Sequence, residues 1–121
     1  MRLHHLALRV TDVERCLHFY RDVLGLSELP LAPGVTATQA SWLRAGDVVL
    51  MLERTLRGRG AASGSGHVLV LAVDDLSAWE ARLTRFAVTL DDRTPHTLYV
   101  RDPEGHRVGL STYAFDVNPP A

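Results

Sequence analysis

The sequence predicts an α+β fold in which two βαβββ modules pair to form a curved mixed sheet around a pocket. One observation is an internal repeat: residues 4–13 (HHLALRVTDV) and 67–76 (HVLVLAVDDL) are identical at five of ten aligned positions. Another is the Gly/Ser-rich stretch that separates the two copies. Each copy runs from an alternating apolar stretch into an amphipathic one. The expected layout is a single domain over residues 1–121, with module one at about 1–56, a linker at about 57–66 and module two at about 67–114.

Module one opens with a strand over residues 3–10, where apolar residues alternate onto one face. A helix follows as far as about Leu24, because apolar residues recur there at helical spacing. Thr11 with Glu14 fits a capping box at its start, and Asp12 is the alternative cap. Gly25 suits a left-handed cap at the end of the helix. Short strands are then expected at about 27–31, 35–44 and 47–54.

Module two repeats this order. A strand at about 67–73 leads into a helix at about 76–86, for which Asp74 or Asp75 is the cap. The residues Asp102-Pro103-Glu104-Gly105 predict a tight turn, because proline suits the fixed φ of the second turn position. Further strands are expected at about 88–90, 95–101 and 106–112.

The two copies of the repeat differ mainly on one face. The identical positions 4, 6, 8 and 10 share one strand parity, are mostly apolar and are expected to pack under the helices. The diverged positions carry His5, Ala7 and Arg9 in the first copy and valine or alanine in the second. Strand alternation places these on the opposite, concave face. We therefore expect a pocket that is apolar in its middle with a few polar side chains, as small-molecule sites are.

The composition excludes several classes of protein. A net charge of −1 gives no broad basic field for nucleic acid or an anionic membrane surface. No apolar run approaches the roughly 20 residues that a membrane-spanning helix needs. The single cysteine, Cys16, cannot form an internal disulfide, which fits a reducing compartment. A cytoplasmic location is expected.

Four segments resemble the vicinal oxygen chelate superfamily of glyoxalase I, extradiol dioxygenases, fosfomycin resistance enzymes and bleomycin resistance proteins. They are HHLALRVTDVERCLHFYRDVLGL at 4–26, AGDVVLMLE at 45–53, VLAVDDLSAWEARL at 70–83 and YVRDPEGHRVGL at 99–110. The resemblance covers about residues 3–112. It implies paired βαβββ modules whose sheets enclose a pocket, and it implies a homodimer. The chemistry is not implied, because this fold serves many functions.

The resemblance also implies four positions for metal ligands, which map onto His5, Met51, Val68 and Gly109. Only His5 offers a nitrogen or oxygen donor, whereas a divalent ion wants three or four donors. We therefore expect no cofactor. The alternative is a divalent metal bound by His5, Glu53 and His67, which requires a β-bulge because His67 has the opposite strand parity.

Several functions stay open from the sequence, and whether the chain is an enzyme is one of the open points. The preferred hypothesis is a metal-free protein that binds and sequesters a hydrophobic or aromatic small molecule. Bleomycin itself is not favoured, because its binding proteins have acidic grooves and this chain is nearly neutral. The alternatives are a divalent-metal-dependent lyase or dioxygenase, and a metal-free enzyme that uses His5 or Glu53 as an acid or base. Arg9 and Arg107 either grip an anionic ligand group or pair with a carboxylate such as Glu53. The candidate ligand-contacting residues are His5, Arg9, Trp42, Met51, Glu53, Val68, Arg107 and Gly109.

Overall fold

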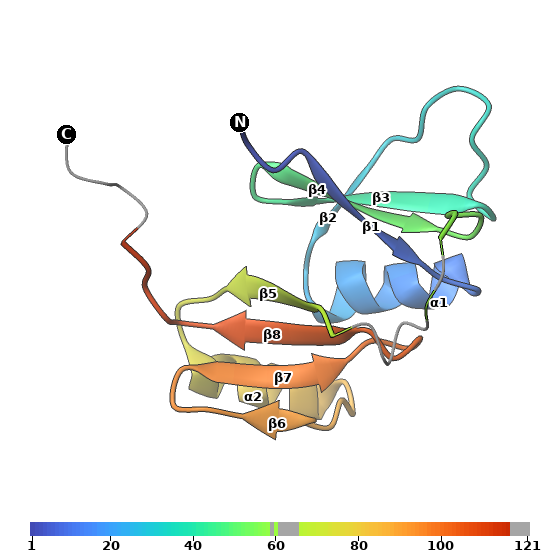
Figure 1. Cartoon of the computed structure of the whole chain (residues 1–121). Helices are drawn as coiled ribbons and strands as arrows, with labels where there is room; N and C mark the ends of the chain where they lie inside the picture. The colour runs from blue at the N-terminus through green and yellow to red at the C-terminus, as the bar shows by residue number, and fades with distance from the viewer. Residues whose placement is uncertain (59, 61–65, 117–121) are drawn as a thin grey trace. The chain divides into compact units, whose positions relative to one another are not determined.

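The computed structural model describes residues 1–58, 60 and 66–116. The chain divides into two compact units, and each is described by itself. The first unit comprises Met1–His67 together with Asp102–His106, and the second comprises Val68–Arg101 and Arg107–Ala121. Figure 1 shows that each unit carries one sheet and a helix, which confirms the α+β class and the repeated order of strand, helix and three strands. Of the predicted linker at 57–66, residues 59 and 61–65 lie outside the described part of the chain.

The sheet of the first unit is mixed. Its strand order is β1-β4-β3-β2, with β1 parallel to β4 and the other pairs antiparallel. Helix α1 packs against β3 and β4. The strands are β1 (His5–Arg9), β2 (Ser27–Leu29), β3 (Ala40–Ala45) and β4 (Val48–Glu53). The expected strand at 35–44 was too long at its start, because Gln39 donates back to the Thr36 carbonyl in a turn.

The helix of the first unit differs from the expected continuous α-helix. It begins as α1 (Val13–Leu17) and continues as a π-helical segment, η1 (His18–Val23). Asp12 caps it by accepting from the Arg15 N–H, so the capping box of Thr11 with Glu14 was wrong. Thr11 instead binds the carboxylate of Glu104, through both its N–H and its hydroxyl. The left-handed conformation expected at Gly25 is confirmed by its φ of 83°.

The second unit repeats the arrangement. Its strand order is β5-β8-β7-β6, with β5 parallel to β8 and the other pairs antiparallel. Asp75 caps helix α2 (Leu76–Arg85) by accepting from the Ala78 N–H, and α2 packs on β7. The strands are β5 (Val68–Ala72), β6 (Asp92–Arg93), β7 (Thr97–Arg101) and β8 (Arg107–Ser111).

The expected strand at 88–90 was wrong. The N–H of Val88 donates to the Leu83 carbonyl and that of Ala87 to the Thr84 carbonyl, so these residues close the end of α2. The short strand forms later, at Asp92–Arg93. Residues 102–105 do form a tight turn, in which the Gly105 N–H donates to the Asp102 carbonyl.

The two faces of each sheet differ in burial as the repeat predicted. On β4, Leu50 and Leu52 are buried, whereas Met51 and Glu53 between and after them are only half-buried. On β5, Val68 and Val70 are exposed, whereas Leu69 and Leu71 are half-buried. A fully buried leucine contributes about 2 kcal/mol to folding, so the helix-covered faces hold each unit together. We call the opposite, less buried face of each sheet its open face. Among the described residues, no helix is long and apolar enough to cross a membrane.

Candidate functional site

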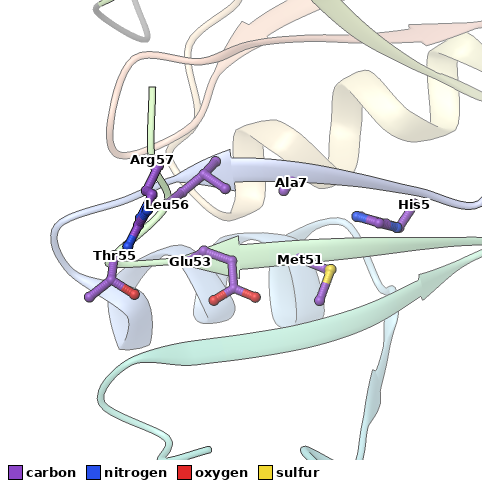
Figure 2. A pocket seen from close by; sticks show the side chains of 7 residues that line it. All are labelled: His5, Ala7, Met51, Glu53, Thr55, Leu56 and Arg57. Carbon is purple, nitrogen blue, oxygen red and sulfur yellow. The ribbon is translucent and has the colours of Figure 1, made fainter. Parts of the chain in front are cut away.

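The open face of the first unit carries a cavity of about 400 Å³. Figure 2 shows it bounded by β1, β4 and the segment that follows β4. Strand alternation explains the contribution of the sheet, because alternate residues of β1 and β4 share one face. Three of the residues expected from the sequence line it, namely His5, Met51 and Glu53. The full lining is His5, Ala7, Met51, Glu53, Thr55, Leu56 and Arg57.

Glu53 is held in place by Trp42. The indole Nε1–H of Trp42 donates to Glu53 Oε1 over 3.1 Å. Trp42 pairs with Met51 across β3 and β4, so its side chain stands on the same sheet face as the cavity. Trp42 is half-buried and is not one of the residues that line the cavity. Its visible role is therefore to orient the carboxylate that does.

Arg9 is committed to the backbone. Its guanidinium donates to the carbonyl oxygens of Leu56, Gly58 and Gly60, the last over 2.6 Å. It thereby fastens the segment that supplies Leu56 to the wall of the cavity. The sequence suggested a carboxylate or an anionic ligand group as the partner of Arg9, whereas its partners in the structure are backbone carbonyls.

The donors of the alternative metal site are not gathered. His5 pairs with Val49 on the neighbouring strand, and Glu53 lies four residues beyond Val49. His5 and Glu53 are therefore separated by about 13 Å along the strand direction. His67 is exposed and precedes β5, whose pairing with β8 runs without a register shift. Within the described ranges, no group of three or more His, Cys, Asp or Glu side chains is placed to hold a metal ion. The residues present therefore do not fit a divalent ion.

The open face of the second unit carries a larger groove, of about 500 Å³. Its aromatic wall is built by His96, Tyr113 and Phe115, whose rings lie 5.5 Å and then 4.7 Å apart. The sequence reasoning missed all three. Strand alternation gave no signal for them, because His96 precedes β7 and Tyr113 and Phe115 follow the end of β8. The full lining is Val70, Ala72, Thr94, His96, Thr97, Tyr99, Ser111, Tyr113 and Phe115.

Tyr99 explains why position 109 is glycine. Gly109 pairs with Val70 on one side and Tyr99 on the other. A Cβ at position 109 would lie 3.2 Å from Tyr99 Cε1 and 3.2 Å from a methyl of Val70. The tyrosine ring thus occupies the space of the missing side chain, and Gly109 itself is buried.

Arg107 supports Tyr99. Its guanidinium carbon lies 4.2 Å from the centre of the Tyr99 ring, a cation–π distance. It also forms ion pairs with Asp91 and Asp92, both at 3.3 Å. Arg107 pairs with Val68 across β5 and β8, and neither of these two residues lines the groove. Of the two roles that the sequence left open for Arg107, the structure shows pairing with carboxylates.

Two hydroxyl groups of the groove are bonded within its wall. The Thr97 hydroxyl donates to Ser111 Oγ over 2.8 Å, and the Ser111 hydroxyl donates to the His96 carbonyl over 3.2 Å. None of the nine lining residues is Asp, Glu, Lys or Arg. The groove therefore favours an uncharged, apolar occupant.

Cys16 is not a candidate nucleophile. It is fully buried in α1. Burial, assisted by the negative charge of Asp102, raises the pKa of its thiol to about 12. The thiolate required for reaction is therefore absent near neutral pH.

A family model matches residues 2–110, that of the Glyoxalase/Bleomycin resistance protein/Dioxygenase superfamily. The chain belongs to this superfamily. The match confirms the resemblance to vicinal oxygen chelate proteins, and it spans both βαβββ units.

Solved structures of the superfamily are similar along almost the whole chain. TnmS3, an antibiotic-binding protein from Streptomyces sp. CB03234, is 28% identical with a TM-score of 0.72, over 92% of this chain and 94% of that one. A glyoxalase/bleomycin resistance protein from the same organism is 27% identical with a TM-score of 0.68, over 91% and 99%. Lactoylglutathione lyase from Agrobacterium tumefaciens, at 23% identity and a TM-score of 0.69 over 91% and 92%, shares the fold.

Proposed function

We propose that this chain is a metal-free small-molecule-binding protein that sequesters an uncharged aromatic compound. The observation that carries the proposal is the groove of the second unit, whose volume of about 500 Å³ lies in the range of drug-sized sites. Similarity to an antibiotic-binding protein at 28% identity supports the same kind of activity.

The exposure of the groove residues supports a binding role. Val70, Tyr113 and Phe115 are 48%, 54% and 76% exposed, although each is large and apolar. Exposed apolar patches of this kind mark binding surfaces, because leaving them in water forgoes the free energy of burial. Tyr99 adds a flat ring braced by Arg107. These aromatic surfaces suit a planar ligand, which stacks on them.

The test is a titration with N-phenyl-1-naphthylamine, a neutral aromatic dye that brightens in apolar sites. Val70→Arg and Tyr113→Ser should each weaken dye binding at least about tenfold, the effect of removing about 1.4 kcal/mol of contact. Phe86→Ser is the matched control, because Phe86 is exposed and does not line the groove. Equal loss in the control variant, or no binding by the unaltered protein, would contradict the proposal.

We also propose that the protein is a homodimer, as its superfamily resemblance implies. The exposed apolar side chains Leu3 and Val68, which do not line the groove, support association, since a partner would remove them from water. Light scattering after size-exclusion chromatography should give twice the mass of one chain. A monomer across the micromolar range would refute this part of the proposal and leave the ligand groove unaffected.

A further inference from the structure

The cavity of the first unit contains a carboxylate that forms no ion pair with any described residue. Glu53 is half-buried and lines the cavity, and the only described hydrogen bond to its carboxylate comes from the neutral indole of Trp42. Within the part of the chain that the structure describes, Glu53 forms no ion pair. Partly buried charges are normally paired, because removing them from water costs free energy. An unpaired carboxylate in a cavity therefore points to a ligand that supplies the missing charge.

The neighbouring cation is unable to supply that charge. The guanidinium of Arg9 is occupied by the carbonyl oxygens of Leu56, Gly58 and Gly60. Arg57, the other charged residue of the lining, is exposed and forms no described ion pair with Glu53.

The rest of the cavity suits a small organic group. Ala7, Met51 and Leu56 give it apolar surfaces, and the thioether of Met51 adapts to varied shapes. Figure 2 shows the Met51 and Glu53 side chains projecting from β4 on the same side. Trp42 fixes Oε1 through its indole N–H, which leaves Oε2 as an acceptor for a donor on the ligand.

We propose that this cavity binds the protonated amine of a small organic cation, with Glu53 as the charge partner and Trp42 as its positioning residue. The site is separate in its residues from the aromatic groove of the second unit. It adds to the proposed function a second ligand chemistry, cationic instead of neutral.

The experiment uses n-butylammonium, n-butanol and n-butyrate, which share a carbon skeleton and differ in charge. Binding is followed by the NMR signal of the Trp42 indole N–H, and the indole of Trp79 in α2 serves as the internal reference. Butylammonium should shift the Trp42 signal in a saturable way and leave that of Trp79 in place. Butanol and butyrate should bind at least about fivefold more weakly, the effect of losing about 1 kcal/mol of ion pairing.

Substitutions separate the charge from the shape of the site. Glu53→Gln keeps the shape and should weaken butylammonium binding at least about fivefold. Glu80→Gln is the matched control, because Glu80 is an exposed carboxylate paired with Arg93 in the second unit, and it should change nothing. Arg57→Gln should tighten binding by removing a like charge. Trp42→Phe, followed by calorimetry, should weaken butylammonium binding about twofold to threefold by freeing the carboxylate.

Two results would overturn the proposal: an equal response to butanol, or unchanged butylammonium binding by Glu53→Gln. Naphthylamine binding by the same variants separates this site from the proposed function. A Glu53→Gln protein that still binds the dye shows that it is folded and that the groove of the second unit is intact. If the unaltered protein does not bind the dye but does bind butylammonium, this result contradicts the proposed function alone.

Discussion

The hydroxyl of Tyr20 donates a 2.7 Å hydrogen bond to the carboxylate of Asp102, which joins the π-helical segment to a turn 82 residues further along the chain. Asp102 also accepts from Nδ1 of His106 and from the backbone N–H groups of Glu104 and His106. All of these residues belong to the first unit. The buried carboxylate is thus satisfied by four donors.

Asp102→Asn should destabilise the protein by about 2–4 kcal/mol, because the amide nitrogen would face donors where the carboxylate accepts. Urea denaturation measures the change in the free energy of unfolding. Asp47→Asn is the control, since Asp47 is exposed in a turn and should change that free energy by no more than about 0.5 kcal/mol. Equal effects of the two substitutions would contradict the account of Asp102.

Acid should weaken the protein through the same carboxylate. Burial alone would raise the pKa of Asp102, but the hydrogen bonds from His106 and Tyr20 outweigh it and lower the pKa below its ordinary value of 3.8. A carboxyl with a lowered pKa contributes stability that is present above 3.8 and is lost as the pH falls through the lowered value. Urea midpoints measured from pH 6 to pH 2 should therefore fall below pH 4. Tyr20→Phe removes one donor and should make this fall shallower.

The order and faces of the strands could be predicted because they depend on local pattern. Apolar alternation in the repeat predicted the more exposed face of β5, which carries Val68 and Val70, and Asp75 was a recognisable cap. The π-helical segment could not be predicted, because no local signal marks it. The cap choice at α1 was misjudged for a related reason: Thr11 is taken by Glu104, 93 residues away.

The candidate site could be predicted only in part. Strand parity correctly placed His5, Met51 and Glu53 on one cavity. The aromatic wall of Tyr113 and Phe115 was missed because the last expected strand stopped at residue 112. The partners of Arg9 are backbone carbonyls of a glycine-rich segment, and carbonyls carry no side-chain signature in a sequence.

Gly109→Ala should cost about 1 kcal/mol of stability, because the new Cβ would press on Tyr99 and Val70 at 3.2 Å. It should also weaken naphthylamine binding by displacing the Tyr99 ring. The double variant Gly109→Ala with Val70→Ala should recover part of the lost stability, since it removes one of the three close contacts, the third being with Thr97 Cγ2 at 3.3 Å. Thermal denaturation checks both variants, and no recovery in the double variant would show that the crowding lies elsewhere.

Arg9→Gln should loosen the segment after β4. Its guanidinium bonds to Leu56, Gly58 and Gly60 would be lost, and losing even about 1 kcal/mol of local stability raises the open population about fivefold. Trypsin cleavage after Arg57, timed by mass spectrometry, should accelerate by at least that factor. Arg44→Gln is the control, because Arg44 is an exposed arginine that binds only the nearby Gly46 carbonyl. A cleavage rate that Arg9→Gln leaves unchanged would show that these contacts do not restrain the segment.

Removal of metal should leave the protein unchanged. Of the four ligand positions that the superfamily resemblance implies, Met51, Val68 and Gly109 carry no nitrogen or oxygen donor in their side chains. His5 lies instead with its Nδ1 2.9 Å from Nδ1 of His4 at the exposed start of β1. Elemental analysis of the purified protein should find much less than one zinc, manganese, iron or nickel ion per chain. A metal ion bound to the native state would raise the melting temperature, and its removal would lower it. Because we expect no bound metal, EDTA should leave the melting temperature unchanged. One ion per chain that disappears in His5→Ala would instead contradict the metal-free proposal.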